Sequence, residues 1–389
     1  MELVTYEDAL TRLKRFLGGT HFARSDEDVK VAVDSAYQGL CTERKWHYYN
    51  SIWGFNTQAP VESTGTYVHS TRKLTMATAT PSWVLTGAIS MDGIVADVES
   101  LNTATNPSVM LMGTDRNFGQ NYATSTSLTL YQEHITLPDN FRDIDVSVAG
   151  DAAGRPLSCM SPSEYVYQHQ FGSVTGDPTH YCIMQDPENL GRTALFLYPA
   201  PAQVRTYRVA YRKKPRDLWY TGTEAEASET GTVTISAAAA ITGSSTAFAS
   251  RMAGSVFRVS STANTVPTDK YGTNRYAEQG IIKTYTSATS LTLASAFTGT
   301  YSSARFVISD PVDIDPIMIP AFYARCRLEL ARLRTDTHLR EQLPMLESEY
   351  ERLLLEAKNT DNKISQAKQT GGGRRAWDWT NMRYSGDVG

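Results

Sequence analysis

The change in character between the ends and the middle of this sequence most constrains its fold. Residues 1–54 and 313–358 carry apolar side chains every three or four positions, which is the spacing of one helix face. Residues 55–310 carry Thr, Ser, Val and Tyr in short alternating runs between Gly, Pro and Asn, which is typical of antiparallel strands. We therefore predict an α+β fold, in which helices from both ends pack into one helical body and a central antiparallel β region lies between them.

Two helices are predicted near the N-terminus. The first carries an apolar stripe from Val4 to Leu17 and ends at the glycine pair that follows. The second begins at Ser25, a capping residue followed by acidic side chains that suit the positive end of a helix dipole. Its apolar repeat predicts an end between Trp46 and Ile52.

Two more helices are predicted near the C-terminus. Asp315 caps the first, Pro316 takes its first position, and an apolar stripe continues to Leu333. The second is predicted over 337–357, where Pro344 either kinks the helix or marks its true start.

The β-rich part contains what looks like an internal repeat, with one copy in 55–134 and another in 221–312. The alternative is a chance likeness of two segments that are rich in Thr and Val. Each copy is long enough for a small barrel or sandwich of about five or six strands. The matched segments are 65–68 with 231–234, 94–98 with 281–282, 108–111 with 290–293, and 128–130 with 306–308.

A different β segment, 135–220, lies between the two copies. Strands are predicted near 144–148, 195–198 and 206–211, and a short helix is predicted to start at Ser161, with Pro162 in its first turn.

The last part, 359–389, is predicted to be a flexible, extended tail, because it has no apolar repeat and contains a run of three glycines. Its aromatic and basic side chains are of the types that dominate binding hot spots, so we expect it to dock on another molecule; folding back onto its own chain is the alternative. These side chains are Arg374, Arg375, Trp377, Trp379, Met382, Arg383 and Tyr384.

Composition and motifs argue against several classes of function. The 37 basic and 41 acidic side chains give a net charge of −4, whereas capture of nucleic acid needs concentrated Lys and Arg. No apolar run is long enough to span a membrane, and the N-terminus lacks an apolar signal segment. Phosphate-binding glycine loops are absent from the sequence, so no nucleotide cofactor is expected.

The side chains able to carry chemistry are scattered. The cysteines show no CxxC spacing and are predicted to be buried thiols of a protein made in a reducing cytoplasm, and the seven histidines show no ligand spacing, so no metal is expected. The cysteines are Cys41, Cys159, Cys182 and Cys326, and the histidines include His47, His69, His134 and His180.

One cluster of acidic side chains suggests an alternative function, a protein that cleaves or binds glycans, because glycosidases use paired carboxylates. It consists of Asp139, Asp143 and Asp145. Turn formation and solvation explain them better. Neither Ser161 nor Ser163 lies in the G-x-S-x-G motif of a hydrolase nucleophile, and we predict that the chain is not an enzyme.

The order of several short motifs resembles the head-to-tail adaptor proteins of bacteriophages, in particular the family of tail tubular protein A of short-tailed phages. The resemblance covers about 1–220 and 315–358, while the second β module departs from it. The motifs are Ile135-Thr136-Leu137-Pro138-Asp139-Asn140-Phe141, Ser161-Pro162 with Tyr165, Leu197-Tyr198-Pro199-Ala200-Pro201, and Tyr207-Arg208-Val209-Ala210-Tyr211.

The resemblance implies a structural protein of the virion that is assembled in the host bacterial cytoplasm. Twelve copies would form a ring under the portal protein, with the helical bodies lining the ring and the terminal tail anchoring it. Tail proteins, such as the nozzle or fibres, would dock on the other side. DNA would pass through the channel without specific binding.

Overall fold

The computed structural model of the chain describes residues 3–17, 25–102, 109–114, 117–144, 156–169, 175–187, 189–261, 265–267, 274–333 and 337–370. Two compact units divide the chain. Unit 1 combines Met1–Tyr48 with Pro215–Gly372, and unit 2 contains Tyr49–Lys214. The α+β class predicted from the sequence is confirmed, whereas the division of the chain into six segments stays a prediction.

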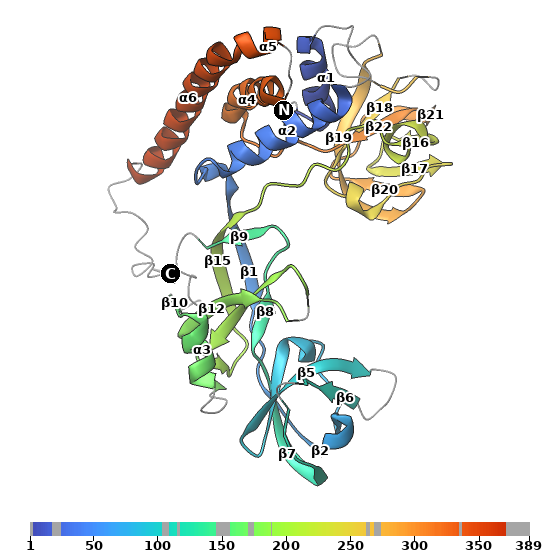
Figure 1. Cartoon of the computed structure of the whole chain (residues 1–389). Helices are drawn as coiled ribbons and strands as arrows, with labels where there is room; N and C mark the ends of the chain where they lie inside the picture. Colours follow the sequence, from blue (N-terminus) through green and yellow to red (C-terminus); the bar gives the residue numbers. More distant parts are fainter. Residues whose placement is uncertain are drawn as a thin grey trace, which may run out of the picture. The chain divides into compact units, whose positions relative to one another are not determined.

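Helices from both ends of the chain form the helical body of unit 1 (Figure 1). Helices α2 and α6 both pack on α4, and α1 packs on α2, so the predicted pairing of the two chain ends is confirmed. A buried cluster joins Leu328 and Ala331 of α4 to Leu346 of α6, with Phe16 of α1 packed against it. The helices are α1 (Tyr6–Leu17), α2 (Ser25–Thr42), α4 (Ile319–Leu333), α5 (Thr337–Glu341) and α6 (Leu343–Thr370).

Two predicted helix ends are wrong. Helix α2 ends at Thr42, before the predicted range, and Trp46 follows as a buried side chain whose indole N–H donates to the Leu40 carbonyl at 2.8 Å. Helix α6 continues to Thr370 through the first part of the predicted tail. Pro344 does mark its start, as one of the two predictions for this proline stated.

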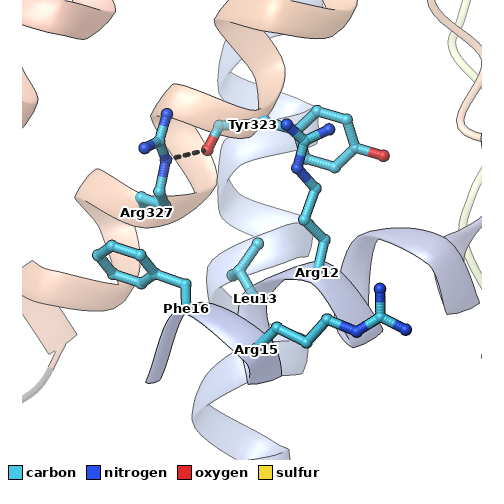
Figure 2. Close-up of a pocket in the computed structure, with 6 residues that line it drawn as sticks. All are labelled: Arg12, Leu13, Arg15, Phe16, Tyr323 and Arg327. Atoms are coloured by element: carbon cyan, nitrogen blue, oxygen red, sulfur yellow. Dashed lines mark hydrogen bonds between the residues drawn. The ribbon is translucent and has the colours of Figure 1, made fainter. Parts of the chain in front are cut away.

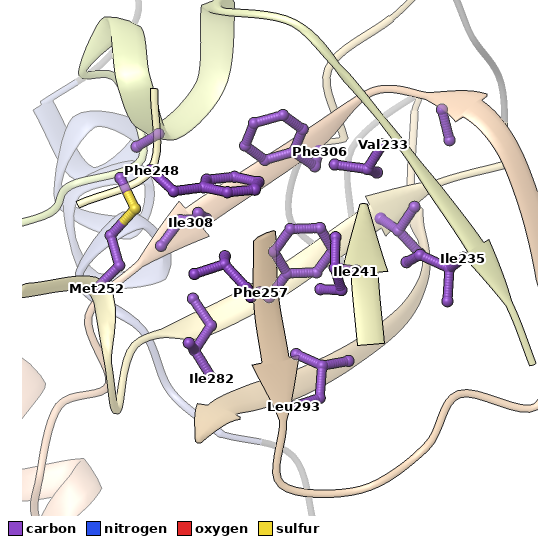
Figure 3. Packing of buried hydrophobic residues seen from close by; sticks show 14 of the residues in the cluster. Val233, Ile235, Ile241, Phe248, Met252, Phe257, Ile282, Leu293, Phe306 and Ile308 are labelled. Atoms are coloured by element: carbon purple, nitrogen blue, oxygen red, sulfur yellow. The ribbon is translucent and has the colours of Figure 1, made fainter. Parts of the chain in front are cut away.

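The second β module completes unit 1 as a seven-stranded sheet in the order β21-β16-β17-β20-β19-β18-β22. Figure 3 shows its aliphatic and aromatic side chains meeting in one core, where Phe257 stacks on Phe306 with ring centroids 5.5 Å apart. The edge strands β21 and β22 are separated in the chain by Arg305 alone. The strands are β16 (Thr232–Ser236), β17 (Ala240–Ser244), β18 (Val256–Ser260), β19 (Tyr276–Ser287), β20 (Ser290–Leu293), β21 (Thr300–Ala304) and β22 (Phe306–Ser309).

A buried arginine ties this module to helix α1. Arg258 on β18 is 1% exposed and donates to both carboxylate oxygens of Asp8, at 3.0 and 2.7 Å. It also lies 4.7 Å from the centroid of the Tyr276 ring. A paired and stacked guanidinium can remain charged in the interior, so this contact fixes α1 on the sheet.

Asp310, directly after β22, is a second buried charge at this junction. Its carboxylate accepts hydrogen bonds from the Arg216 guanidinium at 3.0 Å and the Ser255 hydroxyl at 2.6 Å. The backbone N–H groups of Trp219 and Tyr220 donate to its other oxygen at 2.6 and 2.7 Å. Four donors therefore hold the chain that enters the module against the strand that leaves it.

Glu278 on β19 holds the turn between β20 and β21. The backbone N–H groups of Thr298 and Gly299 donate to its carboxylate at 2.9 and 2.6 Å, and the Tyr301 hydroxyl donates at 3.0 Å. Burial raises the pKa of Glu278, but these hydrogen bonds outweigh it and leave the pKa below its ordinary value. Burial and this carboxylate together raise the pKa of Tyr301 to about 12.

The contribution of Glu278 to stability should depend on pH. Since its folded-state pKa is depressed, the stabilisation is present above the unfolded-state value of about 4.3 and is lost as pH falls through the folded-state value. The difference in unfolding free energy between the wild type and Glu278→Gln should therefore shrink as pH falls below about 4. Hydrogen exchange of peptides from β19 and β21 at a series of pH values, referred at each pH to the intrinsic exchange rate, measures it, and a difference that does not change with pH would contradict the assignment.

Unit 2 contains the first β module, which is a closed barrel in the order β2-β3-β6-β5-β4-β7. Tyr67, Phe118 and Leu130 are among the side chains that fill its core. Strand β7 pairs back on β2 and closes the barrel, which confirms the predicted small barrel. The strands are β2 (Val61–Val68), β3 (Lys73–Met76), β4 (Gly87–Met91), β5 (Ile94–Asn102), β6 (Val109–Met112) and β7 (Tyr122–Gln132).

The two modules have the same strand order when β21 and β22 are taken as one interrupted sixth strand. In each, the first strand pairs with the second, the second with the fifth, the fifth with the fourth, the fourth with the third, the third with the sixth, and the sixth with the first. The segments matched in the sequence fall on corresponding strands, for example 128–130 on β7 and 306–308 on β22. This shared order supports the predicted repeat.

The central segment of unit 2 contains small sheets and helix α3 (Pro162–His169). Ser161 caps this helix as predicted, since its hydroxyl accepts from the Glu164 N–H at 3.2 Å. The sheets are β1-β15-β9, β10-β12-β13-β8 and β11-β14. Their strands are β1 (Asn50–Asn56), β8 (His134–Thr136), β9 (Phe141–Asp143), β10 (Ser158–Cys159), β11 (Thr175–Gly176), β12 (His180–Gln185), β13 (Thr193–Tyr198), β14 (Ala200–Pro201) and β15 (Thr206–Lys213).

Strand β1 begins at Asn50, within the segment 1–54 that was predicted to be helical. All seven of its residues pair with β15, and Phe55 stacks on Tyr207 with ring centroids 5.4 Å apart. The strands predicted near 195–198 and 206–211 are confirmed as β13 and β15. Of the strand predicted near 144–148, positions 145–148 lie outside the described residues.

Candidate functional site

The side chains predicted to dock on a portal lie outside the described residues. They are Arg374, Arg375, Trp377, Trp379, Met382, Arg383 and Tyr384. Helix α6 precedes them in the chain and is described to its end at Thr370.

The C-terminal half of α6 is attached to the N-terminal part of the helical body. Arg44, which follows α2, donates to the Asn362 side chain at 2.9 Å and lies 3.2 Å from the Asp361 carboxylate. The backbone N–H of His47 donates to the same carboxylate at 3.1 Å. Asp361 is buried, so this polar contact fixes the C-terminal half of α6 on the helical body.

A pocket of about 300 Å³ lies between α1 and α4, and we call it the arginine pocket (Figure 2). The Arg12 guanidinium lies 4.0 Å from the centroid of the Tyr323 ring. Arg327 donates from Nε to the Tyr323 carbonyl at 3.5 Å and from its terminal nitrogen to Glu349 of α6 at 2.9 Å. The pocket is lined by Arg12, Leu13, Arg15, Phe16, Tyr323 and Arg327.

Three guanidinium groups line the arginine pocket, and that of Arg327 is paired with Glu349. Burial raises the pKa of Tyr323, and the nearby Arg12 acts in the opposite direction. The phenol therefore stays neutral at neutral pH and offers an aromatic face beneath a cation. Such a pocket combines charge and apolar surface, and it suits an anionic group carried on an apolar support.

The sequence did not predict the arginine pocket. Its basic and aromatic side chains come from α1 and α4, which are some 300 positions apart in the chain. One signal was available, since Arg12, Arg15 and Phe16 follow the three- and four-residue spacing of one helix side.

The aspartate cluster is engaged by arginines in the described chain. Asp143 accepts two hydrogen bonds from Arg212, at 2.7 and 2.5 Å, and Asp139 pairs with Arg192 at 2.7 Å. Asp145 lies outside the described residues. These pairs favour the structural interpretation of Asp139 and Asp143 over a pair of catalytic acids.

The histidines and cysteines were candidates for a metal site because their side chains are common metal ligands. No group of three or more His, Cys, Asp or Glu side chains is arranged to hold a metal ion within the described ranges. His134 is buried against Phe196, and burial lowers its pKa. The prediction of buried thiols is wrong for Cys159, which is exposed because β10 is an edge strand, while Cys41, Cys182 and Cys326 are buried.

Comparison with known families concerns the middle of the chain. Residues 113–239 match the SU10 adaptor protein family. The matched part contains β7, the central segment and the first strand of the second β module. The match supports a phage adaptor, a structural protein of the virion, and it does not confirm the narrower likeness to tail tubular protein A.

A search of curated proteins found no match to this chain. Within the described part of the chain, no helix combines the length and apolar character needed to cross a membrane.

Proposed function

We propose that copies of this chain form the ring that joins a phage head to its tail. The ring docks on the portal protein, continues the DNA channel and provides a platform for tail proteins. The observation that carries this proposal is the match of residues 113–239 to the SU10 adaptor protein family.

The fold of unit 1 supports this role. Both chain ends meet in one helical body, which the buried Arg258 attaches to a β module through Asp8 of α1. A rigid body with unlike faces can make heterologous contacts that close into a ring, and the resemblance described above implies twelve copies.

The charge balance also supports a passive channel. Each phosphate that a protein neutralises adds salt-dependent affinity for DNA, which would retard its passage. A net charge of −4 provides no general attraction for nucleic acid.

Electron microscopy of virions tests the proposal. We expect a cyclic ring of this protein at the head-to-tail junction, with twelvefold symmetry. Particles that lack the protein, or that contain it away from this junction, would refute the adaptor role.

The tail is proposed to anchor the ring on the portal. A chain that ends at Thr370 should keep its secondary structure and melting temperature, because the contacts of Asp361 and Asn362 remain, but its binding to portal protein should fall at least tenfold. Pull-down with purified portal measures the binding. The matched control is Trp377→Ala with Trp379→Ala in the full chain, which should reproduce most of the loss; unaltered binding by the shortened chain rejects the anchor.

A further inference from the structure

We infer that neighbouring copies of the chain meet through a patch on β1 and β15 of one copy and a stripe on α2 of the next. We call these surfaces the β1 patch and the α2 stripe. The inference rests on the proposed ring and adds the residues that would join its subunits. The β1 patch consists of Ile52, Gly54, Arg208 and Ala210, and the α2 stripe consists of Glu27 and Val31.

The β1 patch lies on one face of a strand pair (Figure 1). Ile52 pairs with Ala210 in the register of β1 and β15. Two positions further along, Gly54 pairs with Arg208. Residues that face each other in an antiparallel pair point to the same side, and the next residue points to the other side. The other side of β1 packs into a core through Phe55, so the β1 patch is the outer face of the pair.

The β1 patch offers an apolar side chain and a cation. Ile52 is 75% exposed. Arg208 is also exposed, and it forms no hydrogen bond or ion pair with the residues that the structure describes. Arg212, on the same strand, is different, because its Nε donates to Asp143 at 2.7 Å. A partner that covers the β1 patch must therefore supply a carboxylate next to an apolar group.

Gly54 indicates that this partner comes close to the strand. Glycine inside a strand weakens it and often marks a place where another backbone approaches. Neither the backbone nor the described neighbours of Gly54 require glycine. Its φ is not in the left-handed region, and an added Cβ would lie 3.6 Å from the Tyr207 carbonyl oxygen, which is an ordinary contact.

The α2 stripe provides the complementary groups. Glu27 and Val31 are one turn apart, so their side chains lie on the same side of the helix. Glu27 is exposed and has no ion pair or hydrogen bond within the described ranges, and Val31 is 49% exposed. The buried side of α2 is formed by other positions, among them Val33, Ala36 and Leu40. The α2 stripe is therefore on the solvent side of its helix.

The spacing of the two surfaces agrees as well. Side chains one turn apart on a helix have Cβ atoms about 5–6 Å apart, and diagonal neighbours in an antiparallel pair, such as Ile52 and Arg208, lie about 7–8 Å apart. One copy can therefore place its Glu27 carboxylate at the Arg208 guanidinium of the next. Val31 then packs on Ile52, and Gly54 leaves room for the helix.

The two surfaces are different, as a contact that closes a ring requires. The β1 patch belongs to unit 2 and the α2 stripe to unit 1. Each copy can give its stripe to one neighbour and its patch to the other. Duplex DNA suits the β1 patch less well, because DNA is bound by rows of cations, whereas here a single unpaired guanidinium lies beside an isoleucine.

Exchange of the two charges tests the contact. Arg208→Glu and Glu27→Arg should each lower the amount of this protein in phage particles at least tenfold, because like charges then face each other. The matched control is the double variant, which carries both substitutions in one chain and keeps the wild-type net charge. It should recover at least half of the wild-type amount, since each reversed patch meets a reversed stripe.

The particles are produced with each full-length variant in place of the wild-type chain, and mass spectrometry measures the amount of the protein per particle. Circular dichroism checks that the variants are folded, as expected for substitutions at exposed positions. Normal incorporation of either single variant, or a folded double variant that is not recovered, overturns the contact. Absence of the wild-type chain from particles refutes the ring itself, whereas a wild-type ring with normal incorporation of the single variants keeps the adaptor role and removes only this contact.

Discussion

Replacement of Asp310 with alanine is expected to destabilise unit 1 by about 3–5 kcal/mol, since it breaks a buried charge pair by removing one partner. Asp310 is 0% exposed, and its loss leaves the N–H groups of Trp219 and Tyr220 without their acceptor and removes the anion paired with Arg216. Buried donors without a partner carry the full cost of desolvation.

Hydrogen exchange of peptides from β18 and β22 measures this effect within unit 1, where global unfolding of a two-unit chain would mix transitions. The control is Glu347→Ala, which removes an exposed ion pair with Arg332 in the same unit and should cost less than about 1 kcal/mol. Equal effects of the two substitutions would show that burial of Asp310 is not the source of the stabilisation.

Replacement of Arg258 with alanine is expected to cost about 3 kcal/mol, the value for a charge-assisted hydrogen-bond pair that is largely buried. The substitution removes the guanidinium partner of Asp8, although the Asp8 side chain reaches solvent and can be partly hydrated. We therefore expect the largest local change in α1, whose attachment to the β module depends on this guanidinium.

Hydrogen exchange tests this attachment. We expect faster amide exchange over Tyr6–Leu17 in Arg258→Ala, while exchange in the barrel of unit 2 stays unchanged. Arg352→Ala is the matched control, because the ion pair of Arg352 with Glu356 is exposed on both sides and contributes little. If α1 exchanged at the wild-type rate in Arg258→Ala, other contacts would hold the helix.

Local patterns in the sequence were sufficient for the class and the order of elements. Asp315, Pro316 and Pro344 mark helix starts through backbone chemistry that acts within a few residues, and the structure has helices beginning at these points. The alternation of strand residues likewise located β13 and β15.

Elements that depend on distant partners could not be predicted. Residues 359–370 have no apolar repeat, and α6 extends through them where Asp361 and Asn362 contact Arg44. Strand β1 pairs with β15, about 150 positions away, so its sequence alone does not separate it from the preceding helix. Tertiary contacts decide such cases against local propensity.

The candidate sites also combine local features, which the sequence shows, with contacts between distant residues, which it does not show. The spacing of Asp139 and Asp143 was visible, but the arginines that pair with them come from β15 and from the loop before β13. The arginine pocket needs α1 and α4 together, and no local motif encodes that meeting.

The pairing of the first with the last strand in both β modules has a consequence for how such chains can change. In the barrel β2 pairs with β7, and in the second module β16 pairs with β21, so the chain enters and leaves each module at neighbouring points. A segment whose ends meet can be gained, lost or exchanged while the host scaffold keeps its path. Recombination between related chains can therefore replace a whole module and leave the remainder of the fold unchanged.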